Sequence, residues 1–417
     1  MEDVILRDEV KEKLSEIGEA DILVGIPSFN NADTISHVVR AVQAGFAKYF
    51  PDRKAILVNS DGGSKDGTMD VVEKLVIEDF QPFLISQREN LLSKIVTPYH
   101  GIPGKGSAFR TIFQVAKELK VKACAVVDSD LRSITPEWID LLIRPVLDRD
   151  FDFVSPYYLR HKYDGTITNS IVYPVTRALY GKHIRQPIGG DFGFSGRLAE
   201  FYLTKDVWES DVARFGIDIW MTTTAVANDF KVCQSFLGAK IHAAKDPSSD
   251  LSAMLTQVVS ALFMLMEEYP DKWKAVRATD PVPLFGFQFS VGLEPIKVNL
   301  ERMISMFRLG ITELGAILQE IVSPETFAGL EEAAKGSAFS LSDELWSRLI
   351  FDYALACHRK TMSAAHILKT LTPLYLGKVA SLVQDMAESS ADEVEARLED
   401  LCGAYEKLKP YLIEKWQ

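Results

Sequence analysis

Two carboxylates that lie two residues apart, Asp128 and Asp130, follow the short apolar run of residues 123–127. Side chains of alternate residues in an extended segment point to the same side. Two carboxylates beside phosphate oxygens and water form the oxygen-rich ligand set that Mg²⁺ and Mn²⁺ prefer. Hydration at the beginning of a loop is the alternative, because an acidic pair facing water needs no other partner. The pair therefore predicts either a divalent-cation site or a hydrated loop start.

A glycine-rich segment with one lysine, YHGIPGKGSAFRT, occupies residues 99–111. Gly101 and Gly106 have the spacing of a phosphate loop, but Ser107 follows where that pattern requires lysine. A nucleoside triphosphatase is therefore disfavoured. Glycines around Lys105 just before a helix still suit close contact with a nucleotide or a phosphate. A glycine-rich turn with a solvated lysine is the alternative.

The elements that would position these residues are alternating strands and helices. Strand-like runs are expected at residues 22–27, 54–60, 83–86, 123–130 and 151–156. Apolar residues with helical spacing follow the first two runs, over residues 35–46 and 69–75. This alternation predicts an α/β fold with a mainly parallel sheet and crossover helices.

Polar residues gather where the expected strands end. They are Ser28 and Asn30, then Asn59 and Asp61, then Asp128 and Asp130. Ligands of such sheets bind at the carboxyl ends of the strands, so we expect one site to draw on all three ends. Asn30, Asn31 and Asp33 could instead cap the helix that follows. Capping does not account for Asp61, which comes earlier, at the strand tip.

The composition, with 47% hydrophobic and 25% charged residues, is that of a soluble globular protein. A net charge of −12 argues against a general nucleic-acid binder. The first 20 residues have mixed charges and no apolar core, so we expect no signal peptide. The longest apolar run, residues 252–266, is too short to span a bilayer and predicts a buried helix. We therefore expect a cytoplasmic protein without stable membrane insertion. Scattered cysteines without a CxxC spacing, which suit a reducing compartment, are Cys124, Cys233, Cys357 and Cys402.

The last third of the chain is expected to be helical. Helical segments are predicted over residues 300–322, 342–360 and 390–416, and Ser390 and Glu393 have the spacing of a capping box. We expect an N-terminal helix over residues 1–20, an α/β domain over 21–250 and an α-helical extension over 251–417. The extension would serve packing or oligomerisation, including a homodimer, rather than chemistry.

The polar strand ends together with the D-x-D pattern resemble nucleotide-diphospho-sugar glycosyltransferases of the GT-A fold. IPSFNNADTI, VNSDGGSKDGT and VVDSD follow one another in the order and spacing of that group. A closer resemblance is to the glucosyl-3-phosphoglycerate synthase group and the related mannosylglycerate synthases. It rests on GIPGKGSAFR, QPIGGDFGFS, RFGIDIWMTT and LGAKIHAAKDP. The resemblance implies a Rossmann-like catalytic domain in which residues 21–156 form the nucleotide-binding half and residues 157–250 the acceptor half.

The resemblance also implies roles for single residues at the nucleotide. The nucleoside pocket would be lined by Pro27, Ser28, Asn30, Asn31 and Asp61. Lys105 would approach the base, and Asp128 and Ser129 would contact the ribose and the diphosphate. Lys240 and Lys245 stand where the family tends to carry arginine for the diphosphate, which keeps the charge and loses the bidentate geometry.

The same resemblance implies the metal ligands and the catalytic acids. Asp130 and His242 would bind the divalent cation, Mg²⁺ or Mn²⁺; a loop or core histidine is the alternative at His242. Asp191 and Asp218 align with acids beside the sugar and the acceptor. Carboxylates there can hold sugar hydroxyls or help to deprotonate the acceptor. At Asp218 the family carries glutamate, which is longer by one methylene, and a structural pairing with a backbone turn is the alternative for both acids.

Acceptor contacts are implied for a further set of residues. They are Gly165, Thr166, Thr168, Ile188 and Gly189. Thr166 stands where relatives that use phosphoglycerate carry arginine, and Ala244 where they carry asparagine. Losing the arginine removes the natural partner of an acceptor phosphate. Glycerate or another small hydroxylated acid is therefore as consistent with the sequence as 3-phosphoglycerate.

We therefore expect a metal-dependent retaining glycosyltransferase that moves glucose or mannose from UDP-glucose or GDP-mannose to a small acid, as in compatible-solute biosynthesis. An inverting, family-2-like transferase acting on a polysaccharide or glycolipid is the alternative, with Asp191 or Asp218 as the base. A nucleotidylyltransferase would carry a glycine-rich, basic first loop, which GIPSFNNADT is not. A binding module without catalysis would not need Asp128, Asp130 and His242 together.

Overall fold

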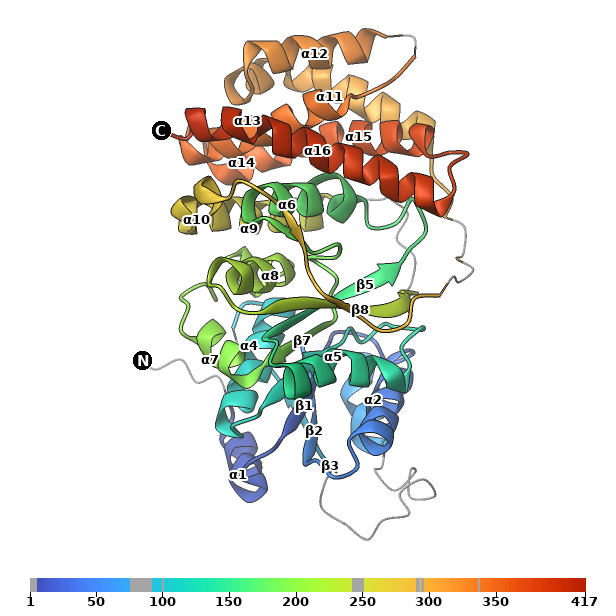
Figure 1. The fold of residues 1–417 in the computed structure, drawn as a ribbon, viewed down its shortest axis with the longest axis vertical. Coiled ribbons are helices and arrows are strands. Elements are labelled where there is room, and N and C mark those ends of the chain that lie inside the picture. The colour runs from blue at the N-terminus through green and yellow to red at the C-terminus, as the bar shows by residue number, and fades with distance from the viewer. Residues whose placement is uncertain are drawn as a thin grey trace. The chain divides into compact units, whose positions relative to one another are not determined.

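The computed structural model describes residues 6–75, 92–99, 101–241, 251–289, 293, 296–336 and 338–417. Within these residues eight strands form one sheet in the order β10-β8-β5-β7-β4-β1-β2-β3 (Figure 1). The strands are β1 (Ile22–Ser28), β2 (Ala55–Asp61), β3 (Leu92–Pro98), β4 (Ala123–Val126), β5 (Phe153–Leu159), β7 (Phe192–Ser195), β8 (Val232–Ala239) and β10 (Leu284–Phe285). All neighbours are parallel except β7, which is antiparallel to β4 and β5. The predicted α/β fold with a mainly parallel sheet is confirmed.

The chain divides into two compact units, each assembled from separated stretches. The first comprises residues 1–159, 184–243 and 282–291, and the second residues 160–183, 244–281 and 292–417. The sequence-based division used consecutive ranges instead, with boundaries after residues 20 and 250. That division into domains stays a prediction.

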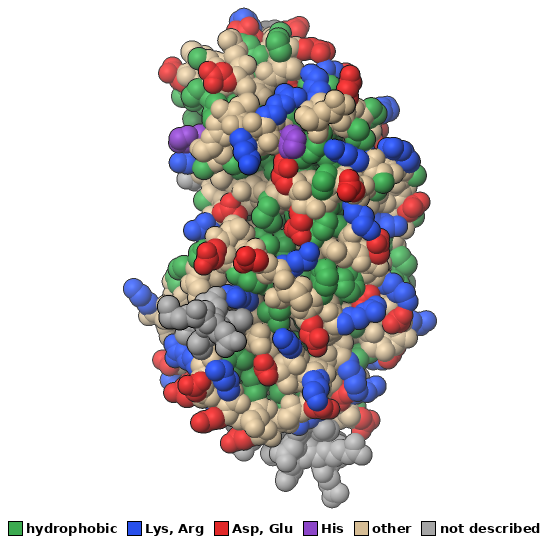
Figure 2. Space-filling model, turned by 90° about the vertical axis from the view of Figure 1, so that its left-hand side faces the viewer, with side chains coloured by type: hydrophobic (Ala, Val, Ile, Leu, Met, Phe, Trp, Pro, Cys, Tyr) green, Lys and Arg blue, Asp and Glu red, His purple; other side chains and the backbone are tan. Residues whose placement is uncertain are grey.

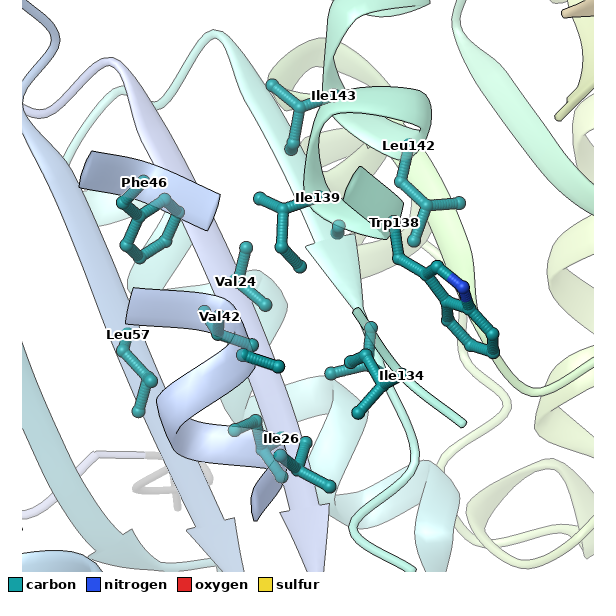
Figure 3. Packing of buried hydrophobic residues seen from close by; sticks show 14 of the residues in the cluster. Val24, Ile26, Val42, Phe46, Leu57, Ile134, Trp138, Ile139, Leu142 and Ile143 are labelled. Carbon is teal, nitrogen blue, oxygen red and sulfur yellow. The ribbon is translucent and has the colours of Figure 1, made fainter. Parts of the chain in front are cut away.

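Helices of the first unit cover both faces of the sheet. They are α1 (Asp8–Ile17), α2 (Ile35–Tyr49), α3 (Thr68–Lys74), α4 (Lys105–Glu118), α5 (Pro136–Arg149), α7 (Gly196–Leu203) and α8 (Ile217–Ala227), with a short 3-10 helix, η3 (Asp211–Ala213). Val24 and Leu57 point from the strands toward Phe46 of α2 and Ile139 of α5 in one buried cluster (Figure 3). Burial of each such side chain contributes about 1.5–3 kcal/mol. This core holds β1, β2 and β4 in a fixed register.

The other face of the sheet is covered by α4 and α7. Phe113 of α4 packs edge-on against Phe194 of β7, with ring centroids 5.4 Å apart, and lies 5.3 Å from the ring of Tyr202 in α7. A Cβ atom at Gly25 would lie 2.6 Å from Ile112, so the first strand needs glycine where α4 crosses it. The close crossing fixes where the N-terminus of α4, and with it Lys105, lies.

Most of the predicted strands are confirmed to within a few residues. The runs at residues 22–27, 54–60 and 151–156 correspond to β1, β2 and β5. The strand predicted over residues 123–130 is too long, since β4 ends at Val126 and the acids that follow lie in a turn. The run at 83–86 lies outside the described residues. The predicted helices over 35–46 and 69–75 correspond to α2 and α3.

The second unit is helical. It contains α6 (Tyr173–Tyr180), α9 (Ser252–Glu268), α10 (Pro270–Ala275), α11 (Leu300–Ile321), α12 (Pro324–Lys335), α13 (Asp343–His358), α14 (Ala364–Lys369), α15 (Leu371–Asp385) and α16 (Ala391–Lys415). It also holds a π-helical turn, η2 (Thr168–Val172), and the paired strands β6 (Lys182–His183) and β9 (Asp280–Pro281). The predicted capping box at Ser390 and Glu393 begins α16, and the apolar run at 252–266 is α9, as expected. In the described part of the chain, no helix combines the length and apolarity that a bilayer span requires.

A buried arginine ties α6 to α16 within the second unit. Arg177 forms ion pairs with Glu399 and with Glu406, the second at 2.7 Å. Lys409 of α16 donates hydrogen bonds to the carbonyls of Ala178 and Val276, both at 2.9 Å. The segment 160–183 is thereby held by residues more than 200 positions later in the chain.

Charges of both signs are interspersed on the face of the molecule shown in Figure 2. The fields of neighbouring opposite charges largely cancel beyond a Debye length of about 8 Å at physiological salt. Attraction of an anionic ligand is therefore expected to depend on individual lysines at the strand ends rather than on this face.

Candidate active site

The first two strand ends are joined by the Asp61 carboxylate, which is fully buried. Its Oδ1 accepts hydrogen bonds from the backbone N–H groups of Gly63 and Ser64, at 2.8 and 2.7 Å. Its Oδ2 accepts from the hydroxyls of Ser28 and Ser64, both at 2.7 Å. Pro27, the strand residue before Ser28, is buried in the ladder opposite Ser60 of β2. Asp61 therefore shapes the second loop and fixes Ser28 beside it.

Two asparagines connect the first loop to both neighbouring loops. Asn30 has a left-handed backbone, with φ 54°, a conformation that asparagine tolerates better than most residues, and its N–H donates to Ser64 Oγ at 2.8 Å. The Asn31 N–H donates to Thr68 Oγ1 at 2.9 Å. Its side-chain oxygen accepts from the Ser129 hydroxyl at 2.8 Å. Sequence positions 28–31, 61–68 and 128–130 are thus brought together as predicted.

The predicted capping role of these polar residues is wrong in its details. The N-cap residue of α2 is Thr34, and it makes no side-chain cap; instead its hydroxyl donates to the Ser129 carbonyl at 2.9 Å. The N–H groups of Thr34 and Ile35 donate to the backbone carbonyl of Asn31. Asp33 is exposed. The side chains of Asn31 and Thr34 therefore connect the first loop to the Asp128 turn and do not cap the N-terminus of α2.

Lys105 is the first residue of α4, and close packing explains the glycines beside it. A Cβ atom at Gly106 would lie 1.9 Å from the carbonyl oxygen of Val212, and one at Gly104 would lie 2.4 Å from that of Ala213. The two glycines therefore let α4 begin directly against η3. This geometry aims the single lysine of the segment at the strand ends.

The Lys105 ammonium contacts two carboxylates. Its Nζ lies 2.8 Å from Asp128 Oδ1 and 3.2 Å from Asp218 Oδ1. Asp218 is the second residue of α8, a position where a carboxylate is favoured by the helix dipole. The ring of Phe109 lies one turn further along α4, with its centroid 5.3 Å from Nζ. The solvated-lysine alternative is thereby wrong, because the Lys105 side chain is only 15% exposed and pairs with two carboxylates.

A second lysine approaches Asp128 from the other side. Lys240, which follows β8, is buried, and its Nζ lies 2.7 Å from Asp128 Oδ2, 2.7 Å from Asp191 Oδ2 and 2.7 Å from the carbonyl oxygen of Gly189. Each oxygen of Asp128 therefore pairs with a different lysine. This arrangement leaves Asp128 with its charge compensated by protein groups.

Asp191 is enclosed on all sides. It is 0% exposed, and its Oδ1 accepts a hydrogen bond from the Asp128 N–H at 2.8 Å. Its Oδ2 accepts from the hydroxyl of Tyr158 as well as from Lys240. Both oxygens are thus occupied by donors that also shape the Asp128 turn.

Burial and ion pairing act on these pKa values in opposite directions. Burial alone lowers the pKa of the Lys105 ammonium, but the carboxylates of Asp128 and Asp218 outweigh it and raise that pKa. Burial disfavours the ionised form of Asp128, yet Lys105 and Lys240 hold its pKa well below the ordinary value. Burial raises the pKa of Asp191 and of Asp218, and the neighbouring lysines offset only part of the rise. The site therefore combines one firmly ionised carboxylate with two that hold a proton more readily than a free aspartic acid.

Gly190 lies at the centre of the cluster and cannot be replaced without displacement. Its φ is 89°, and a Cβ atom would lie 2.4 Å from Asp128 Oδ2 and 3.1 Å from Lys240 Nζ. The preceding Gly189 is equally close-packed, because its Cβ atom would lie 2.3 Å from Pro156. Ile188, before them, is half-buried. The GG pair thus lets the backbone pass directly beside the ion pairs.

Asp130 is placed differently from Asp128. It is half-buried, and within the described part of the chain no side chain or N–H donates to its carboxylate. No group of three or more metal-ligating side chains is found among the described residues. Mg²⁺ is commonly held by one or two carboxylates together with substrate phosphates, and the available Asp130 carboxylate fits that arrangement. His242 and Lys245 lie outside the described residues, as does Ala244.

The expected acceptor residues are divided between the units. Ile188 and Gly189 belong to the first unit, whereas Gly165, Thr166 and Thr168 belong to the second. Thr166 is buried, and its hydroxyl is hydrogen-bonded to the hydroxyl of Tyr375 in α15. Gly165 has a left-handed backbone with φ 63°. Within the second unit these residues shape the turn before η2.

Two residues of the cluster were missed by the sequence analysis. Tyr158 is hidden in a strand whose residues read as ordinary core, and Gly190 was included only within QPIGGDFGFS, where of the two glycines Gly189 alone received a role. The GG dipeptide before an acid was a usable signal for a close backbone approach. No signal in the sequence pointed to Tyr158.

No curated protein matches the sequence. Three solved structures of glucosyl-3-phosphoglycerate synthase from Mycobacterium tuberculosis each match with a TM-score of 0.44 and cover 83% of that chain. The complexes with Mn²⁺, UDP and glucosyl-3-phosphoglycerate and with Mg²⁺ and UDP are both 20% identical over 60% of this chain. The complex with Mn²⁺, UDP-glucose and phosphoglyceric acid is 19% identical over 61%.

More than half of the chain matches a known protein family. Residues 28–264 match the family described as mannosylglycerate synthase, GT domain. The matched segment contains all the side chains of the cluster around Asp128, and it is more than half of the 417 residues. The protein therefore belongs to the mannosylglycerate synthase glycosyltransferase-domain family.

Proposed function

We propose that the protein is a metal-dependent retaining hexosyltransferase that uses a nucleotide diphosphate sugar, UDP-glucose or GDP-mannose, and a small hydroxylated acid such as glycerate or 3-phosphoglycerate. The observation that carries the proposal is the pairing of Lys105 and Lys240 with opposite oxygens of Asp128, two residues before Asp130 in the same turn. One buried ammonium group, of Lys240, and one largely buried, of Lys105, at the carboxyl ends of a mainly parallel sheet are suited to an anionic diphosphate. The lysines would exchange part of their contact with Asp128 for phosphate oxygens.

The divalent cation would be held by Asp130 and His242, and when bound it neutralises the charge that develops on the departing nucleoside diphosphate. The protein groups orient the donor around it. Ser129 is fixed by Asn31, and the loop that carries Asp130 is fixed in turn by the hydrogen bond from Thr34 to the Ser129 carbonyl. The nucleoside pocket would be formed by the joined loops that carry Ser28, Asn30 and Asp61.

Asp218 is the carboxyl that we assign to the sugar or the acceptor. It shares Lys105 with Asp128, and burial raises its pKa, which favours a carboxyl that can exchange a proton with a sugar or acceptor hydroxyl. Asp191 has both oxygens occupied by Lys240, Tyr158 and the Asp128 N–H. We therefore assign Asp191 to positioning rather than to proton transfer.

The first test is thermal unfolding in the presence of UDP or GDP, with and without Mn²⁺ or Mg²⁺. A ligand that binds the native state at 100 times its Kd stabilises it by about 2.7 kcal/mol. We expect one diphosphate to raise the unfolding temperature, and to do so more strongly with the cation. Asp130→Asn is expected to abolish the additional effect of the cation and to keep the unfolding temperature of the free protein. Asp33→Asn, which alters an exposed acid of the neighbouring loop, should behave as the wild type. If neither diphosphate stabilises the wild-type protein, the proposal is wrong.

The second test is the anomeric configuration of the product. Incubation with UDP-glucose or GDP-mannose and either glycerate or 3-phosphoglycerate should yield a product with the α-configuration of the donor, read from the anomeric proton by NMR. A β-configured product would establish the inverting alternative, with Asp218 as the base that remains available. The threonine at position 166 leads us to expect turnover with glycerate at least equal to that with 3-phosphoglycerate.

A further inference from the structure

We propose that Tyr158 is a positioning residue that keeps Lys240 available for the diphosphate of the donor. This inference rests on the proposed function and adds a residue to it. The argument depends on three features: an irregularity in β5, the contacts of the tyrosine hydroxyl and the place of its ring.

The irregularity is a β-bulge between β5 and β8. Tyr157 pairs with Phe236, but Tyr158 pairs with Gly238, so Leu237 is the additional residue on β8. Gly238 has φ 76°, which accommodates the change of register. Bulges commonly redirect a side chain next to an active site. Here the bulge lies at the strand position whose side chain enters the lysine–aspartate cluster.

The hydroxyl of Tyr158 reaches the oxygen that also binds Lys240. It donates a hydrogen bond to Asp191 Oδ2, and Lys240 Nζ lies 2.7 Å from that same oxygen. Because two donors share this one acceptor oxygen, the tyrosine hydroxyl takes up part of its negative charge and weakens its attraction for the ammonium. Tyr158 therefore limits how strongly Asp191 retains Lys240.

The ring of Tyr158 lies beside the same ammonium. Its centroid is 5.2 Å from Lys240 Nζ, within the range of a cation–π contact, and it packs against Trp138 with centroids 5.6 Å apart. Tyr158 is almost completely buried. The ring thus bounds the position of Lys240 while the hydroxyl moderates its ion pair.

The charged groups around Asp191 support this balance. Lys240 and Asp128 face it directly, Tyr158 donates to it, and Lys105 interacts with it at longer range. Burial raises the pKa of Asp191, while the ammonium of Lys240 and the hydroxyl of Tyr158 lower it. Without the hydroxyl, Lys240 would be the only side chain among the described residues that donates to Oδ2 of this buried carboxylate, and it would be drawn away from the diphosphate.

The test is Tyr158→Phe, which keeps the ring and removes only the hydroxyl. Isothermal titration with UDP and GDP in the presence of Mn²⁺ should show affinity for the bound diphosphate reduced by about 10-fold, the effect of losing one hydrogen bond to a charged group. Affinity for the corresponding nucleoside, measured by competition, should change by less than about twofold, because the nucleoside lacks the phosphates to which we assign Lys240. Tyr157→Phe alters the neighbouring tyrosine, whose ring lies 6.1 Å from Phe236, and should leave both affinities unchanged.

Three outcomes would contradict the inference or its basis. An unchanged diphosphate affinity of Tyr158→Phe would overturn it. Equal losses for diphosphate and nucleoside would also overturn it, because they would indicate a general structural role. Absence of diphosphate binding by the wild type would instead refute the proposed function. Should Tyr158→Phe unfold, Asp191→Asn tests the same contact from its other side: it removes the charge that retains Lys240, so affinity for the diphosphate should be kept or raised, and a selective loss of that affinity would overturn the inference.

Discussion

Replacing Lys240 by methionine is expected to destabilise the protein by about 3–5 kcal/mol and to abolish transfer. The substitution removes one buried ammonium that compensates two carboxylates, and a buried charge left without its partner has a cost of this order. Of the donors in the described part of the chain, Asp191, at 0% exposed, would keep the Tyr158 hydroxyl and the Asp128 N–H. Thermal unfolding and an assay of hexose transfer at a temperature below the transition measure the two effects.

A matched control is present in the second unit. Lys378 is also fully buried, and its Nζ lies 2.7 Å from Asp343 and 3.1 Å from the Leu341 carbonyl oxygen. Asp343 also pairs with Arg397, at 2.8 Å, so Lys378→Met should lower stability by less and leave the rate of transfer below the transition unchanged. Transfer by Lys240→Met at the rate of the control would contradict the assignment of Lys240 to the diphosphate.

The loss of stability in Lys240→Met should also depend on pH. Lys240 lowers the pKa of Asp191 in the folded protein, so its removal raises that pKa further above the unfolded value. A carboxyl with a raised folded-state pKa contributes stability at low pH that is lost as the pH rises through that pKa. The difference from the wild type should therefore be largest near neutral pH and smaller in mildly acidic solution.

Gly190→Ala is expected to reduce transfer by about 100-fold, with a smaller effect on folding. Its Cβ atom would lie 2.4 Å from Asp128 Oδ2, so the carboxylate and Lys240 must both move. A displacement of about 1 Å in a positioned group can cost on the order of 100-fold in rate. The left-handed backbone at φ 89° adds about 1–2 kcal/mol of strain for any residue with a side chain.

Gly18 provides a control that separates the effect of backbone strain from the effect of displacing Asp128 and Lys240. It has φ 73°, ends α1, and has no atom within 4 Å of the position of an added Cβ. Gly18→Ala should therefore show the backbone strain alone, with full activity. If both variants transfer hexose at the wild-type rate, the close approach at Gly190 has no functional consequence.

The sequence predicted the strand ends well because their physical signal is local. Apolar runs that finish in polar residues are visible one strand at a time, and the parallel sheet then brings Ser28, Asp61 and Asp128 to one edge. It predicted β3 poorly because that edge strand carries Ser93, Lys94 and Thr97 and reads as half polar. β7 has only four residues, too few to show a period.

The partners within the site could not be read from the chain. The difference between Asp128 and Asp130 depends on Lys105 and on Lys240, which is 112 positions later than Asp128, and spacing says nothing about such a contact. Tyr158 reaches the cluster through a change of register between two strands, which depends on how they pair rather than on the local sequence. A resemblance to known enzymes supplied roles for single residues, but not the ion pairs among them.

The interleaving of the two units sets a limit on how this protein can be divided for experiments. The chain leaves the first unit after Leu159, returns at Ile184, and supplies β10 only after α9 and α10. A fragment that ends near residue 250, at the boundary suggested by sequence, would lack the edge strand β10. It would also contain Arg177 without Glu399 and Glu406, its ion-pair partners in α16. Such a truncation would expose a buried guanidinium and an unpaired sheet edge, so aggregation of the fragment would say nothing about whether the catalytic sheet is stable in the complete chain.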